Sequence, residues 1–124
     1  MRGWRESLPV VACILAGSPA LAQSGQGEAI FDQGCAACHG GVGEGGAGPA
    51  LRNNHTLENR QFVLGIMLRG QLMMPSFAGR LSNDQIAAVA TYIRNSWGNH
   101  YGPITSQEVA EARPHRKSGG QHGD

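Results

Sequence analysis

The chain has 124 residues, with ten Lys and Arg against nine Asp and Glu, so its formal net charge is +1. This length fits one small domain, and the near-neutral charge gives no basis for nucleic-acid binding. With 19 glycines and only 6% aromatic residues, the chain offers little material for a hydrophobic core of its own.

The N-terminus, residues 1–22, has the features of a secretory signal peptide. Two arginines precede an apolar run over 8–16 that is too short to cross a bilayer, and Ala20-Leu21-Ala22 matches an A-x-A cleavage site. We therefore expect an exported, periplasmic protein whose mature chain starts at Gln23. The alternative is lipoprotein processing at Cys13, which would leave a diacylated cysteine at the membrane.

A short helix is expected over Gly27 to Gly34, directly before the most informative segment, Cys35-Ala36-Ala37-Cys38-His39. Cys-x-x-Cys-His is the spacing at which c-type haem is attached. Each thiol adds to one vinyl group of the porphyrin, and the imidazole of His39 then lies against the iron as its proximal ligand.

Cysteine pairs at this spacing also form thiol redox centres and halves of zinc sites. The expected mature chain has no cysteine besides Cys35 and Cys38, and a disulfide between them would close almost no loop. Haem attachment is the better use of the pair. We therefore predict one covalently bound haem c, which supplies the missing apolar filling, and an apoprotein that is largely unfolded.

The middle of the chain is rich in loops. Six glycines between Gly40 and Gly48 predict a flexible loop against a flat ligand, and Pro49-Ala50-Leu51 is expected to be rigid and extended. A helix is expected from an N-cap at Asn59 to about Arg69, ended by Gly70. Its buried face is expected to carry Phe62, Val63, Ile66 and Met67.

The clearest helix signal begins at Ser82-Asn83-Asp84-Gln85, which forms a capping box. Apolar residues then recur at helical spacing up to Trp97, which predicts a helix that ends at Gly98. We expect the folded domain to span 23–100. An extension over 101–112 has a possible short helix near Thr105 to Ala112, and 113–124 is expected to be a basic, disordered tail.

Met74 is the expected second axial ligand of the iron. It lies in the irregular segment 71–80, and Pro75 favours an extended conformation at Met74 that can aim the thioether inward. Thioether sulfur stabilises ferrous iron and raises the potential relative to two imidazoles. The adjacent Met73 is the main rival, whereas Met67 is expected to fill the core.

The sequence also allows a second histidine ligand or an open iron site. His55 or His100 would form a bis-histidine site, although a solvated side chain is the ordinary state of a surface histidine. An open site would indicate a haem enzyme or a gas sensor. His115 and His122 lie in the basic tail, where weak adventitious metal binding is the most that we expect.

These features together resemble the class I c-type cytochromes over residues 25 to 98. The matching residues, in the family's order, are Gly27 and Phe31, Cys35-Ala36-Ala37-Cys38-His39, Gly48-Pro49-Ala50-Leu51, Met74-Pro75-Ser76-Phe77, and Val89 and Tyr92. The resemblance implies an all-α cytochrome c fold, with three to five short helices around one covalently bound haem. It also implies an electron-transfer protein rather than an enzyme.

For the site, the resemblance implies thioether bonds at Cys35 and Cys38, and iron ligation by His39 and Met74. The carbonyl of Pro49 would accept the other N–H of the His39 ring, which fixes the orientation of that ring. The resemblance also implies that Gly27 and Phe31 cross Val89 and Tyr92. It further suggests that Arg69 and Asn53 approach the haem propionates.

The implied function is one-electron transfer between a dehydrogenase or quinol-oxidising complex and a terminal acceptor such as an oxidase. Tyr92 to Asn99, with Val109-Ala110 and Arg113, is similar to the final domain of the cytochrome subunits of quinoprotein alcohol and aldehyde dehydrogenases. This similarity favours a dedicated electron-accepting subunit as the alternative. Those subunits carry three haem motifs, and this chain has one. Membrane association is expected only through a partner or a lipidated Cys13.

Overall fold

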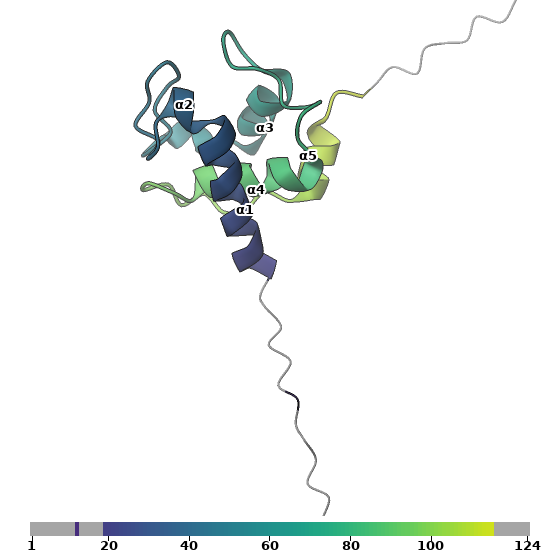
Figure 1. Ribbon diagram of the computed structural model, residues 1–124. Coiled ribbons are helices and arrows are strands. Elements are labelled where there is room, and N and C mark those ends of the chain that lie inside the picture. The colour runs from purple at the N-terminus through teal and green to yellow at the C-terminus, as the bar shows by residue number, and fades with distance from the viewer. Residues whose placement is uncertain (1–11, 13–18, 116–124) are drawn as a thin grey trace, which may run out of the picture.

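The computed structural model describes residue 12 and residues 19–115, and within them the secondary structure is helical (Figure 1). The elements, in chain order, are α1 (Pro19–Gly34), α2 (Ala36–His39), the 3₁₀ turn η1 (His55–Glu58), α3 (Arg60–Arg69), α4 (Asn83–Arg94) and α5 (Ser106–Ala112). Apart from an isolated bridge between Gln71 and Met74, these described residues hold no β-structure. The prediction of an all-α fold is therefore confirmed.

Several N- and C-terminal predictions lie outside the described residues. They are the signal peptide up to residue 18, lipidation of Cys13, and the tail from 116 onward, which includes His122. Within the described part of the chain, no helix has both the length and the apolar character that a bilayer span requires.

The crossing of α1 and α4 forms the centre of the fold, and Figure 1 shows α1 passing across α4. At Gly27 the two backbones are so close that a Cβ atom would collide with the carbonyl oxygen of Ala88. Phe31 is fully buried, and its ring centroid lies 5.7 Å from that of Tyr92 and 4.8 Å from that of Trp97. The predicted contact of Gly27 and Phe31 with the last long helix is present.

The N-terminal helix starts at Pro19, well before the predicted start at Gly27. Proline is well tolerated at the first position of a helix, because its missing N–H would have no helical partner there. The residues that follow include alanines, a leucine and glutamines, which are good helix formers. The helix therefore continues upstream of the part that contacts α4.

The end of α4 differs from the prediction. The helix ends at Arg94 rather than at Gly98, because side chains after it compete for the last carbonyls. Asn95 Nδ2 donates to the carbonyl of Thr91 at 2.7 Å, and Ser96 Oγ donates to that of Tyr92 at 2.6 Å. Trp97 has a φ of 51°, so the chain turns back and carries its ring onto Phe31.

Helix α3 has the predicted limits. The side chain of Asn59 accepts the backbone N–H of Phe62 at its start, and Gly70, with a φ of 72°, ends it. The predicted apolar face is divided between two environments. Val63 and Met67 are buried, whereas Phe62 is 48% exposed.

The C-terminal extension is part of the fold. Helix α5 starts with a second capping box, formed by Thr105 and Glu108, and its residue Val109 is fully buried. The predicted short helix near Thr105 to Ala112 is confirmed. Arg113, which the sequence assigned to the tail, donates to the Asn83 side chain at 2.5 Å and to the carbonyls of Ala78 and Leu81 at 2.6 and 2.9 Å.

Candidate functional site

A cavity of about 660 Å³ lies among α1, α2, η1, α3, α4 and the segment that follows α3. This volume is typical of ligand sites. Its walls are predominantly apolar, and among the described residues that line it there is no Lys, Arg, Asp or Glu. The five predicted site residues all line it: Cys35, Cys38, His39, Pro49 and Met74.

His39 is the last residue of α2, and its side chain is held in a fixed orientation at the cavity. Its Nδ1 atom lies 2.8 Å from the carbonyl oxygen of Pro49, and the residue is only 9% exposed. A ring that donates its Nδ1–H to a carbonyl keeps Nε2 as a neutral acceptor, which is the form that ligates iron. His39 is therefore prepared to act as a metal ligand.

The glycine loop holds the backbone around His39. Gly45 N–H donates to the carbonyl of His39 at 2.7 Å, and Gly48 N–H donates to that of Cys38 at 2.8 Å. The imidazole packs directly on Gly48, where a Cβ would lie 2.8 Å from the ring atom Cε1. The lack of a side chain at Gly48 thus lets the imidazole pack against the backbone of the loop.

The two cysteines of the motif differ in exposure. Cys35 is half-buried and Cys38 is exposed, and both are free. Burial, and secondarily the charge of Cys38, raise the pKa of Cys35 to about 11. Thiol redox centres depend on a lowered pKa, so the structure gives that alternative no support. The zinc alternative also gains no support, since no group of three or more His, Cys, Asp or Glu residues within the described ranges could hold a metal ion.

Met74 and Met73 have different positions relative to the cavity. Gln71 and Met74 exchange two backbone hydrogen bonds, of 3.0 and 2.9 Å, which close a tight turn with Leu72 and Met73 at its tip. Met73 is 91% exposed, whereas Met74 is half-buried and packs on the core. Both lie at the cavity, but only Met74 is part of its packed wall.

The segment that carries Met74 is tied to α3. Phe77 N–H donates to the carbonyl of Met67 at 2.9 Å, and Ser76 Oγ donates to that of Leu68 at 2.5 Å. Met67 itself is 5% exposed and belongs to the core, as predicted. These bonds hold the irregular segment rigidly enough to keep Met74 at one place in the wall.

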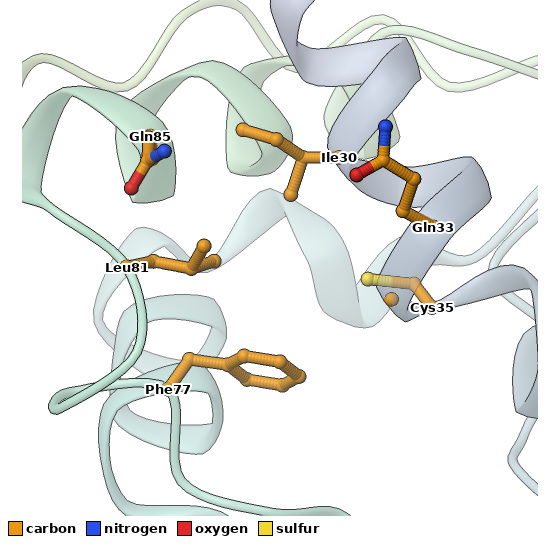
Figure 2. A pocket seen from close by; sticks show the side chains of 7 residues that line it. Ile30, Gln33, Cys35, Phe77, Leu81 and Gln85 are labelled. Atoms are coloured by element: carbon orange, nitrogen blue, oxygen red, sulfur yellow. The ribbon is translucent and has the colours of Figure 1, made fainter.

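A smaller cavity of about 200 Å³ adjoins the first on the other side of Cys35 (Figure 2). The two cavities share Gly34, Cys35, Phe77 and Leu81. Figure 2 shows the sulfur of Cys35 directed toward Phe77 and Leu81, between α1 and the segment before α4. The apolar space at the site thus extends to the buried cysteine of the motif.

The remaining described histidines are away from the cavity. His55 and His100 are exposed, and neither lines the cavity. The Nδ1 atom of His55 lies 3.3 Å from the hydroxyl of Tyr101 instead. His115 is exposed as well. The bis-histidine alternative therefore gains no support from the arrangement of these residues.

The polar residues at the cavity are not those suggested by the sequence. Arg69 and Asn53 are absent from its lining, whereas Asn54 and Thr56 are part of it. Thr56 donates its hydroxyl and its backbone N–H to the side-chain oxygen of Asn54, and Asn54 Nδ2 donates to the carbonyl of Ala50 at 2.8 Å. Two adjacent asparagines at 53–54 indicate a turn, but the sequence does not show that Asn54, rather than Asn53, reaches the cavity.

Asn99 is a further residue that sequence reasoning missed. It is fully buried, and its Nδ2 donates to the carbonyls of Leu51 and Ile93 at 2.8 and 2.9 Å, while its Oδ1 accepts the N–H of Asn54 at 3.0 Å. These bonds join the segment after Pro49 to the end of α4. Asn99 therefore stabilises the wall that supports His39.

Comparisons with known proteins agree with this site. A family model described as "Cytochrome C oxidase, cbb3-type, subunit III" matches residues 22–93. Cytochrome c6 of Leptolyngbya boryana is 39% identical over 77 residues, covering 58% of this chain and 91% of that protein. Cytochrome c-552 of Thermus thermophilus is 33% identical over an alignment of 129 positions, and the match covers 84% of this chain and 84% of that protein.

A third relative is the cytochrome c subunit of an alcohol dehydrogenase (quinone) from Gluconacetobacter polyoxogenes. It is 33% identical over 95 residues, which are 64% of this chain but only 20% of that subunit. The match is thus confined to a small part of a much longer protein.

Two solved structures share the fold. Cytochrome cL from Hyphomicrobium denitrificans superposes with a TM-score of 0.54 at 26% identity, over 58% of this chain and 46% of that one. Cytochrome cL from Methylophaga aminisulfidivorans MPT superposes with a TM-score of 0.55 at 23% identity, over 77% of this chain and 71% of that one. The chain belongs to the class I c-type cytochromes, and it is a single-haem electron-transfer protein with a covalently bound haem c.

Proposed function

We propose that this protein is a periplasmic one-electron carrier in which haem c is attached at Cys35 and Cys38 and its iron is held by His39 and Met74. The observation that carries this proposal is the apolar cavity that brings all four residues together. When bound, haem c supplies an iron that gains and loses one electron. The periplasmic location rests on the signal-peptide features of residues 1–22.

Each residue has a separate role in this proposal. The bond from His39 to the Pro49 carbonyl fixes the imidazole and strengthens its basicity as a ligand. A thioether from Met74 favours the ferrous state and raises the potential relative to a second imidazole. The packed apolar walls exclude water, which limits reorganisation when the charge of the iron changes.

The relatives indicate redox proteins as partners, and we propose a dehydrogenase or quinol-oxidising complex as donor and a terminal oxidase as acceptor. We propose that Leu72 and Met73 contact the redox partner at the mouth of the cavity, since both line the cavity and are 98% and 91% exposed. Exposed apolar side chains that lie side by side, rather than singly, are typical of protein contact sites.

Substitution of Met74 tests the ligand assignment. Met74→Ala is expected to retain covalently attached haem, to lower the midpoint potential markedly, and to make the reduced protein bind carbon monoxide quickly. Met73→Ala is the matched control, and it is expected to leave the potential and the visible spectrum unchanged. Rapid carbon monoxide binding by the wild-type protein, or an unchanged potential in Met74→Ala, would contradict His/Met ligation.

A dedicated electron-accepting subunit of a dehydrogenase is the second candidate. Similarity to the alcohol dehydrogenase subunit favours it, although this chain corresponds to only 20% of that protein. Affinity purification from the native periplasm and membranes separates the two functions. Stoichiometric co-purification with a single dehydrogenase would favour the subunit, and recovery of the free cytochrome would favour the carrier.

A further inference from the structure

Arg94 is the largest fully buried side chain in the described part of the molecule. It is the last residue of α4 and is only 1% exposed. A buried charge is costly unless other groups compensate for the lost hydration. The groups that surround Arg94 therefore determine what this residue does.

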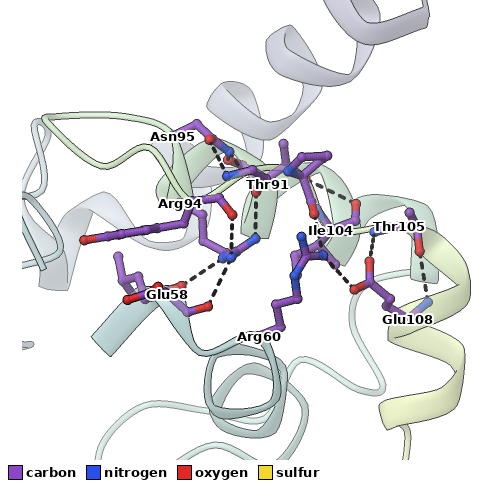
Figure 3. A network of polar contacts seen from close by, with 12 residues as sticks. Glu58, Arg60, Thr91, Arg94, Asn95, Ile104, Thr105 and Glu108 are labelled. Carbon is purple, nitrogen blue, oxygen red and sulfur yellow. Dashed lines mark hydrogen bonds and ion pairs between the residues drawn. The ribbon is translucent and has the colours of Figure 1, made fainter. Parts of the chain in front are cut away.

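The guanidinium group of Arg94 donates only to backbone carbonyls, as Figure 3 shows. Nε donates to Leu57 at 2.8 Å, Nη1 donates to Gly102 at 2.6 Å, and Nη2 donates to Tyr101 at 2.7 Å and to Glu58 at 3.2 Å. Carbonyl dipoles satisfy the N–H groups but carry no net charge. The positive charge is thus solvated by the protein without a direct ion pair, and the carboxylates of Glu108 and Glu58 act on it only from beyond ion-pair distance.

The neighbouring Arg60 is different. Its Nη1 lies 2.7 Å from the Glu108 carboxylate, and this ion pair is the one that the described residues contain (Figure 3). The side chains of Arg60 and Glu108 are 38% and 32% exposed, so water screens their charges. Burial first, and the charge of Arg60 second, lower the pKa of Arg94, whereas the carboxylates of Glu108 and Glu58 act in the opposite direction. An arginine stays protonated in proteins.

Arg94 lies directly behind the wall of the haem cavity. Leu57, whose carbonyl it binds, and Ile93, its neighbour in α4, both line the cavity. The described lining residues include no Lys, Arg, Asp or Glu that would screen the charge. In a water-poor interior, a unit charge acts over a longer distance than at the surface.

We infer that Arg94 is a positioning residue that also raises the reduction potential of the cytochrome, because its buried charge, which has no direct ion pair, favours the less positive, ferrous state in the adjacent cavity. This inference rests on the proposed electron-transfer function. The hydrogen bonds of Arg94 place η1 and the 101–102 segment against α4. The charge sets part of the electrostatic potential inside the cavity.

A purely structural role would have different consequences. Any replacement of Arg94 leaves buried carbonyls without donors, so both a charged and an uncharged replacement destabilise the fold. Only the uncharged replacement removes the charge. Comparison of Arg94→Lys with Arg94→Gln therefore separates the two roles.

The experiment uses the haem-loaded protein and measures the midpoint potential by spectroelectrochemical titration and the stability by thermal unfolding. Arg94→Lys and Arg94→Gln are both expected to unfold at lower temperature than the wild type. At a fixed applied potential, the ratio of ferrous to ferric protein is expected to fall about tenfold in Arg94→Gln, which equals about 59 mV for one electron. Arg94→Lys is expected to stay close to the wild type. Arg60→Gln is the matched control, and its potential is expected to be unchanged.

Equal potentials in the Lys and Gln variants would overturn the inference, and so would a shift in Arg60→Gln as large as that in Arg94→Gln. If Arg94→Gln yields no haem-loaded protein, Arg94→Met, an apolar side chain of adaptable shape, takes its place with the same expected shift. A wild-type protein without a reversible one-electron step would instead contradict the proposed function, so the two failures are distinguishable.

Discussion

The Nδ1 atom of His39 lies 2.8 Å from the carbonyl oxygen of Pro49, ten residues further along the chain. A backbone carbonyl cannot be changed by substitution, so the bond depends on the path of the chain between the two residues. Gly48 allows the ring to pack against the backbone, and Asn99 holds the segment that follows Pro49. The orientation of the proposed proximal ligand is therefore a property of the glycine loop and of α4 together.

Replacement of Gly48 by alanine tests this arrangement. The added Cβ would lie 2.8 Å from Cε1 of His39, so the ring must move away from its bond with Pro49. Overpacking of this kind costs about 1–3 kcal/mol. Gly48→Ala is expected to lower the stability of the haem-loaded protein in thermal unfolding and to shift its potential.

Gly41→Ala is the control for this substitution, because a Cβ at Gly41 meets no atom within 4 Å and its φ is not in the left-handed region. Its stability and potential are expected to match those of the wild type. A Gly48→Ala protein with wild-type stability and potential would show that the ring has freedom to move.

Asn99 is expected to contribute more to stability than an exposed asparagine does. Asn99→Ala leaves two carbonyls and one N–H without partners in the interior, and each unsatisfied group costs about 1–3 kcal/mol. We expect a loss of about 3 kcal/mol in chemical denaturation. Asn59→Ala removes only the N-cap of α3 and is expected to cost about 1 kcal/mol. Equal losses in the two variants would contradict the assigned role of Asn99.

Local signals in the sequence predicted the elements that depend on near neighbours. The capping box of Ser82 and Gln85, the N-cap at Asn59 and the stop at Gly70 each involve residues only a few positions apart. The motif from Cys35 to His39 likewise predicts the haem attachment segment from five consecutive residues. These parts required no knowledge of the tertiary structure.

Long-range partners were not predictable in the same way. Arg94 and Asn99 read as ordinary polar residues at a helix end, but their partners include Leu57 and Leu51, from a segment far upstream. Trp97 fits the apolar spacing of α4, but it lies beyond the end of the helix at Arg94. Pro75 favoured Met74 over Met73 as the sulfur donor, but only the turn between Gln71 and Met74 shows that Met73 is exposed and that Met74 is half-buried.

Leu72 is expected to be a site where substitution stabilises the protein. Its φ is 52°, a left-handed conformation that costs a residue with a Cβ about 1–2 kcal/mol, and its side chain is 98% exposed. Leu72→Gly is expected to raise the free energy of unfolding by about 0.5–1 kcal/mol, after the added entropy of glycine in the unfolded chain. Trp97→Gly, at a φ of 51°, is expected to destabilise, because Trp97 packs on Phe31. A destabilised Leu72→Gly would mean that the leucine makes contacts worth more than its backbone strain.

Removal of the haem is expected to unfold most of the protein. The cavity of about 660 Å³ is bounded by residues from α1, α2, α3 and α4, so without its ligand these helices face an apolar space rather than a packed core. Apolar walls that face water rather than a ligand lose hydrophobic stabilisation of about 25 cal/mol per Å². A small domain, with a stability of about 5–15 kcal/mol, has little reserve against such a loss. We therefore expect haem-free protein, made as the Cys35→Ala/Cys38→Ala double variant, to give a weak helical signal in far-UV circular dichroism and no cooperative melt. Cys38→Ala alone, which retains the proposed attachment point at the half-buried Cys35, is the control and is expected to fold when haem is attached. A native-like helical spectrum with a cooperative melt in the haem-free variant would show that the helices form a sufficient core by themselves.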